Sequence, residues 1–162
     1  MQSPHLLAVI RAALVSAGLL WSGLILAAPW MATSPGPFPS HLAATTYVVG
    51  AAVCHQRPER SFHVASARLP VCARCTGLYL SATLGAIAGV AWAASRGKRA
   101  RTHRREWRPW LAAAAVPTAM TLGLEWLGLW APSNAARALA AVPLGVVGGL
   151  LVAAGLSFRS KL

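Results

Sequence analysis

Four long apolar stretches, separated by short polar segments, constrain the fold of this chain more than any other feature. They cover residues 6–30, 71–95, 109–130 and 135–156. An α-helix rises about 1.5 Å per residue, so about 20 residues cross the roughly 30 Å hydrocarbon core of a bilayer. Each stretch is long enough to do so. We therefore predict four transmembrane helices, which occupy most of the 162 residues and leave no room among them for a separate soluble domain.

The chain carries too little charge to cover a soluble globule. Soluble domains are about 45–50% apolar and about 25% charged, whereas this sequence is 56% hydrophobic and 11% charged. Residues 41–53 form a further apolar stretch that is too short to cross a bilayer, so we expect an interfacial or re-entrant helix there. Residues 29–40 contain four prolines and predict an irregular exposed loop. The predicted fold class is an all-α integral membrane bundle of about four transmembrane helices plus this short helix, forming one membrane domain over residues 1–162.

The first apolar stretch also has features of a secretory signal peptide, because Ala27 and Ala28 would suit a cleavage site. Its apolar core, residues 12–28, is longer than the ~7–15 residues usual in a signal peptide. We therefore expect a retained helix.

The basic residues are unevenly distributed along the chain. The net charge is +12, and seven of the fifteen lysines and arginines lie in residues 96–108. Together with Arg159 and Lys161, this run predicts the cytoplasmic side, because cytoplasmic loops of membrane proteins are rich in Lys and Arg. One crossing separates the run from residues 54–75, which we therefore expect to face outward. The run is placed to meet a lipid bilayer with anionic headgroups, and we expect no nucleic acid as a partner.

Small residues recur at every fourth position in two of the predicted spans. They are Ala73, Gly77, Ser81, Gly85, Gly89 and Ala93 in the second span, and Ala141, Gly145, Gly149 and Ala153 in the fourth. Such a stripe lets another helix approach closely. The two stripes predict a compact bundle and carry no chemistry by themselves.

All three cysteines and two of the five histidines lie in one segment, residues 54–79. Cys72 and Cys75 are three residues apart, so they share one face of the first turn of the second predicted span. Unpaired N–H groups and the helix dipole favour thiolates at a helix start, and Arg74 adds positive charge. This part of the chain is therefore the candidate site.

A metal site is our first interpretation of this segment. Cys54 and His55 would reach Cys72 and Cys75 if the loop between the two pairs folds back. The four side chains would then make a tetrahedral Cys₃His set, which is typical of zinc. His63 could replace His55 as the fourth ligand. The zinc would be structural or would act on a small or lipid-linked substrate.

Two other interpretations stay open. Cys72 and Cys75 could form a redox-active or structural disulfide, because a C-x-x-C pair at a helix start in an oxidising compartment is a dithiol arrangement. The thiols could also simply pack in a membrane subunit that is structural or binds a partner. The sequence contains no evident Ser-His-Asp set, phosphate loop or carboxylate pair, so it does not decide whether the protein is an enzyme.

The same segment carries a recognisable pattern. It reads C-H-Q-x-P-x-R-S-F from Cys54, and P-V-C-A-R-C-T-G-x-Y from Pro70 to Tyr79. This pattern resembles the signature of a bacterial integral-membrane family that is known only as a domain of unknown function. The resemblance implies a multi-pass protein of the bacterial cytoplasmic (inner) membrane. It supplies no reaction.

Polar residues near the cysteines are candidates for supporting roles. Gln56 and Ser61 could orient metal ligands as outer-shell partners. Arg60 and Arg74 could support the site or bind an anionic lipid or lipid-linked ligand, because guanidinium groups match phosphate in geometry.

Glu125 is the only acid inside a predicted span. Arg137 lies at nearly the same depth across the turn that joins the third and fourth spans. An ion within a membrane is costly unless it is paired, so we predict a Glu125–Arg137 ion pair. A structural clasp and a role in moving protons or substrate both stay open.

Overall fold

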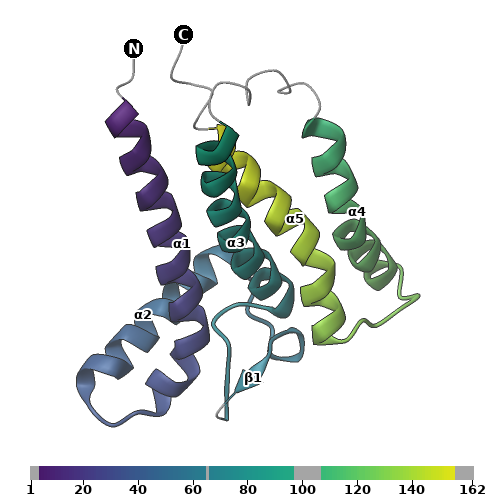
Figure 1. Cartoon of the computed structure of the whole chain (residues 1–162). Helices are drawn as coiled ribbons and strands as arrows, with labels where there is room; N and C mark the ends of the chain where they lie inside the picture. The colour runs from purple at the N-terminus through teal and green to yellow at the C-terminus, as the bar shows by residue number, and fades with distance from the viewer. Residues whose placement is uncertain (1–3, 65, 97–106, 156–162) are drawn as a thin grey trace.

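The computed structural model describes residues 4–64, 66–96 and 107–155, and the chain over these residues is mostly helical (Figure 1). The helices are α1 (Pro4–Thr33), α2 (Pro37–Val53), α3 (Ala73–Arg96), α4 (Trp107–Trp126) and α5 (Asn134–Gly155). Between α2 and α3 lie a short 3₁₀ helix, η1 (Pro58–Arg60), and two two-residue strands, β1 (His63–Val64) and β2 (Ala67–Arg68). The strands pair antiparallel, with His63 opposite Arg68. The predicted all-α class is confirmed.

Three of the described helices are long and apolar enough to cross a membrane, judged by length and composition alone. The spans are His5–Thr33, Ala73–Ser95 and Asn134–Ala154. They correspond to the first, second and fourth predicted spans. Helix α4 has 20 residues but is not among the three, so its crossing of the membrane stays a prediction.

The two ends of the bundle differ in what they hold (Figure 1). The N-terminal end of α1, the end of α3, the start of α4 and the end of α5 lie at one end of the molecule. The β-hairpin, the starts of α3 and α5 and the turn between α4 and α5 lie at the other end. Helix α2 runs obliquely near this second end. The predicted basic loop, residues 96–108, falls mostly outside the described residues.

The most extensive helix contact joins α3 to α5, and it uses the two small-residue stripes. A Cβ atom added to Gly85 would lie 2.1 Å from the carbonyl oxygen of Val146, and one added to Gly149 would lie 2.0 Å from that of Ala82. Backbone therefore meets backbone along this interface. Only residues without a side chain fit at these positions, because contacts that short are forbidden for real Cβ atoms.

We predict that Gly149→Ala destabilises the protein by about 1–3 kcal/mol, the usual cost of forcing an extra carbon into a packed contact. Gly148→Ala is the matched control, since a Cβ at Gly148 meets nothing within 4 Å. That change should be neutral or slightly stabilising, because alanine favours helix over glycine. Thermal unfolding of both variants in detergent, followed by circular dichroism, measures the difference. Equal midpoints for the two variants would contradict the contact.

The predicted irregular loop at residues 29–40 is wrong. Helix α1 continues through Pro29 to Thr33, and α2 starts at Pro37, which leaves only residues 34–36 between the helices. Proline fits the first turn of α2 because the N–H that it lacks has no helical partner there. Near the end of α1, the Thr33 hydroxyl donates to the carbonyl oxygens of Pro29 and Trp30, and the helix continues four residues past Pro29.

The helix in the third predicted span, residues 109–130, begins and ends earlier in the chain, at Trp107 and Trp126. Gly128 adopts a φ of +68°, and its N–H donates to the carbonyl of Glu125, while the N–H of Leu129 donates to that of Leu124. This left-handed glycine closes the helix, as glycine does at many helix ends. The end at Gly128 places Glu125 in the last turn of α4, facing the start of α5.

Candidate functional site

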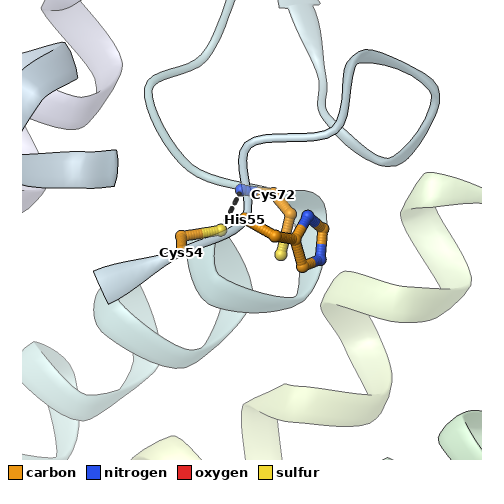
Figure 2. A group of neighbouring side chains, drawn as sticks. All are labelled: Cys54, His55 and Cys72. Carbon is orange, nitrogen blue, oxygen red and sulfur yellow. Dashed lines mark hydrogen bonds between the residues drawn. The ribbon is translucent and has the colours of Figure 1, made fainter. Parts of the chain in front are cut away.

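The cysteine and histidine cluster lies where α2 ends and α3 begins (Figure 2). Cys54 is the residue that caps the end of α2, His55 follows it, and Cys72 immediately precedes α3. The candidate ligand atoms of these three residues all lie within 4.8 Å of one another. The fold thus brings together two segments that are 17 to 18 residues apart in the chain.

All three thiols are free, and they contact one another. The backbone N–H of Cys72 donates to Cys54 Sγ over 3.1 Å. The Cys75 thiol and its backbone N–H both hydrogen-bond to the Cys72 sulfur. Cys75 is not a member of the compact group of ligand atoms, but its sulfur adjoins that group through Cys72. The sulfur of Cys72 is therefore the centre of the cluster.

The surroundings of Cys72 lower the pKa of its thiol to about 5. The largest cause is the hydrogen bond from the Cys75 side chain. Burial opposes the shift, whereas the Cys75 N–H, the Cys54 thiol and the charge of His55 add to it. The lowered pKa favours the Cys72 thiolate, the form that binds metals and attacks disulfides.

Gln56 ties the two cysteine-bearing segments together. Its Nε2 donates to the carbonyl oxygens of Tyr47 and Pro70, each over 2.7 Å. The guanidinium of Arg68 donates to the Gln56 carbonyl, and the Gln56 backbone has a φ of +48°, which is uncommon for a residue with a side chain. Gln56 therefore positions Cys54 and Cys72 through the backbone.

The two histidines of the segment lie in different places. His55 is exposed, and its Nδ1 accepts a hydrogen bond from the backbone N–H of Arg57 over 3.1 Å. His63 is an exposed residue of β1 and is not a member of the compact group. Of the two, only His55 is close enough to the sulfurs to act with them in this arrangement.

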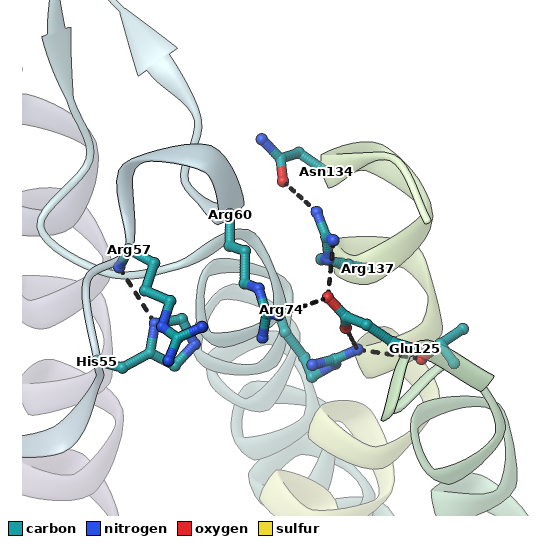
Figure 3. A network of polar contacts seen from close by, with 8 residues as sticks. His55, Arg57, Arg60, Arg74, Glu125, Asn134 and Arg137 are labelled. Atoms are coloured by element: carbon teal, nitrogen blue, oxygen red, sulfur yellow. Dashed lines mark hydrogen bonds and ion pairs between the residues drawn. The ribbon is translucent and has the colours of Figure 1, made fainter. Parts of the chain in front are cut away.

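A second cluster surrounds Glu125 (Figure 3). Three guanidinium groups reach this carboxylate, from Arg60 at 3.1 Å, Arg74 at 3.4 Å and Arg137 at 2.8 Å. Their side chains are 24%, 16% and 10% exposed, and that of Glu125 is 8% exposed. We call these four residues the arginine cage. Arg74 lies between Cys72 and Cys75 in the sequence, so the cage adjoins the cysteine cluster.

Neutral polar groups support the cage. The Oδ1 atom of Asn134 accepts from Arg137, and its Nδ2 donates to the carbonyl of Ser61. The Ser61 hydroxyl donates to the carbonyl of Arg57, and Thr121 accepts a long 3.4 Å hydrogen bond from Arg74. Ser61 thus holds the loop beside the cage, and its side-chain hydrogen bond goes to Arg57 and not to a cysteine or histidine.

The sequence predicted one partner for Glu125, and the structure places three around it. The missed partners, Arg60 and Arg74, had been assigned to supporting or anion-binding roles. A signal was present: Glu125 is one of only three acids in a chain with fifteen lysines and arginines. In a chain with so few acids, a buried carboxylate is expected to form ion pairs with several nearby arginines.

Comparison with known proteins gives a family and two relatives. Residues 54–151 match the model of a family described as "Predicted membrane protein (DUF2085)". An uncharacterized protein of Methanocaldococcus jannaschii is 44% identical over 41 residues, which are 25% of this chain and 26% of that protein. An uncharacterized protein of Methanothermobacter thermautotrophicus is 53% identical over 30 residues, which are 18% of this chain and 27% of that protein.

The chain therefore spans about a quarter of the length of these curated relatives. Both relatives are archaeal, so the bacterial origin expected from the sequence stays a prediction. No solved structure matches the chain.

Proposed function

This chain belongs to the predicted-membrane-protein family DUF2085, and on that premise we propose that it is a membrane protein whose cysteine and histidine cluster binds one metal ion. The observation that carries the proposal is the convergence of the ligand atoms of Cys54, His55 and Cys72 within 4.8 Å. Cys75 would supply the fourth ligand through its contact with Cys72.

The chemistry of this ligand set favours zinc. Thiolate and imidazole ligands at tetrahedral spacing are typical of structural zinc sites, and the lowered pKa of Cys72 favours the thiolate form that such sites require. His55 would have to release the hydrogen bond that its Nδ1 accepts from Arg57. A neutral imidazole that binds a metal through one nitrogen carries its proton on the other, so ligation at either nitrogen competes with that hydrogen bond.

The experiment that tests this proposal is metal analysis of the full chain purified in detergent, combined with thiol titration. We expect about one zinc per chain and few reactive thiols before chelation. Chelation should then expose three titratable thiols. Protein that is free of metal, with three reactive thiols from the start, would contradict the proposal.

A second candidate function, a membrane thiol–disulfide exchange protein, is favoured by one observation. Cys72 has the low pKa of an attacking thiol and contacts the Cys75 thiol. In the exchange, the Cys72 thiolate would attack a substrate disulfide, and the Cys75 thiolate would then displace the mixed disulfide. The substrate would leave with two thiols, and the protein would keep a Cys72–Cys75 disulfide.

We further propose a multi-pass topology in which residues 55–70 face outward and residues 96–108 face the cytoplasm of a bacterial inner membrane. The basic run supports this orientation, as does the position of the cysteine cluster at the opposite end of α3. Cysteines introduced at exposed sites in a background without the native cysteines should react with an impermeant reagent only in residues 55–70 of intact cells. Labelling of residues 96–108 from outside would reverse the assignment.

A further inference from the structure

We propose that the arginine cage binds a phosphate-bearing anion, at a site that does not depend on the proposed metal. The first argument is the charge balance. Three guanidinium groups and one carboxylate leave a net charge of +2 in a cluster whose side chains are 8–24% exposed. The other acid among the described residues, Glu59, is exposed to solvent. Uncompensated charges of one sign are costly at this burial, and an anion removes the excess.

The second argument concerns hydrogen-bond donors. The Nε atoms of Arg74 and Arg137 are buried and have no hydrogen-bond partner within the described structure. Both oxygens of Glu125 are already engaged by the cage. A guanidinium group presents its Nε–H and an Nη–H side by side as a fork, and this fork matches two oxygens of a phosphate. The Nη2 atom of each arginine already donates to Glu125, so the two unpartnered Nε–H groups are the donors left for an oxyanion.

The third argument is the position of these arginines in their helices. Arg74 lies in the first turn of α3, and Arg137 lies in the first turn of α5. The helix dipole is positive at a helix start, so it disfavours a cation and favours an anion there. Two arginines and two helix starts converge on one carboxylate (Figure 3). This arrangement is electrostatically unfavourable for the empty protein and favourable once a phosphate is present.

Two sources of phosphate fit the cage, a free phosphate ester or a lipid headgroup. A groove of about 300 Å³ between α3 and α5 is lined mainly by apolar side chains, including Phe62, Leu84 and Val146. Its lining starts close to the cage in sequence, at Phe62 beside Ser61 and at Ala138 beside Arg137. If the phosphate of a lipid binds in the cage, an acyl chain of the same lipid reaches this groove. If a free phosphate ester binds, bulk lipid of the bilayer fills the groove.

The test uses the full chain in a phosphate-free, non-ionic detergent, titrated with inorganic phosphate by calorimetry. A second arm uses nanodiscs of an uncharged glycolipid with or without phosphatidylglycerol, and the readout is the thermal unfolding midpoint. Arg60→Gln, at the most exposed position of the cage, should weaken phosphate binding about tenfold, the loss expected for one charge-assisted hydrogen bond. Arg60→Lys should retain part of the affinity. Arg108→Gln removes one positive charge at the start of α4 and should change nothing.

The two arms of the experiment distinguish a free phosphate ester from a lipid headgroup as the bound anion. Binding of inorganic phosphate in detergent, weakened by Arg60→Gln, supports a free phosphate ester. A midpoint raised only by phosphatidylglycerol, with the rise lost in Arg60→Gln, supports a lipid headgroup. Phosphate should also raise the midpoint of Glu125→Gln more than that of the unchanged protein, because the anion replaces the missing carboxylate. If neither probe has an effect, or if the effects are equal in Arg60→Gln and the unchanged protein, the proposal is wrong.

Discussion

Glu125→Gln is expected to destabilise the folded chain by about 3–5 kcal/mol, the usual cost of removing one partner from a buried ion pair. The change keeps the size of the side chain and removes its charge. Three guanidinium groups would then face one another without a counter-charge, and the most buried of them is that of Arg137. Thermal or denaturant unfolding in phosphate-free detergent, followed by circular dichroism, measures the loss.

The matched control for this prediction is Glu59→Gln. Glu59 lies in η1, next to Arg60, and is exposed, so the same chemical change there should alter the stability by less than about 0.5 kcal/mol. A similar loss in both variants would show that the effect comes from overall charge and not from the cage.

The double variant Glu125→Gln, Arg137→Gln tests the direct contact between the two residues. It should be more stable than the sum of the single losses predicts, with a coupling of at least about 1 kcal/mol. Recovery should be incomplete, because Arg60 and Arg74 still lack their carboxylate. Strictly additive losses would argue against a direct Glu125–Arg137 interaction.

The helices could be predicted from the sequence because the relevant signals are local. Long apolar stretches and small residues at every fourth position need no knowledge of distant contacts, and they identified α1, α3 and α5 and the two stripes of small residues. That these two stripes face each other is known only from the structure. The errors arose at prolines and glycines. Pro29 and Pro37 indicate a loop by composition, although Pro29 is accommodated inside α1 and Pro37 opens α2. The third predicted stretch runs past Gly128, whose left-handed backbone closes α4.

The residues of the candidate site could be predicted from the sequence, but their positions relative to one another could not. The pattern of residues selected Cys54, His55 and Cys72, yet their convergence depends on the clamp that Gln56 makes between Tyr47 and Pro70. That contact joins backbone carbonyls far apart in the chain, and no periodicity in the sequence reports it. The same limit applied to Arg60 and Arg74, because their shared partner, Glu125, lies 65 and 51 residues further along the chain.

The cysteine cluster is the site of the other large expected effect. If one zinc is bound, Cys54→Ser, Cys72→Ser and Cys75→Ser should each remove most of the metal, because a serine hydroxyl is a poor substitute for a thiolate. His55→Ala should lower the metal content as well. His63→Ala is the matched control: His63 is an exposed histidine of the same segment that lies outside the group, so the metal content should not change. Elemental analysis of each purified variant measures these differences.

The variant Cys54→Ser distinguishes a metal site from a redox-active dithiol. Cys54 takes part in the cluster by accepting the Cys72 N–H, whereas the exchange reaction needs only Cys72 and Cys75. A dithiol protein would therefore still form a reducible Cys72–Cys75 disulfide after Cys54→Ser, and it would hold no metal before the change. A zinc protein would lose its metal and gain two reactive thiols in the same variant. Stoichiometric metal in the unchanged chain that survives Cys54→Ser would exclude Cys54 as a ligand, and loss of the metal in His63→Ala would show that His63, on β1, replaces His55 as the histidine ligand.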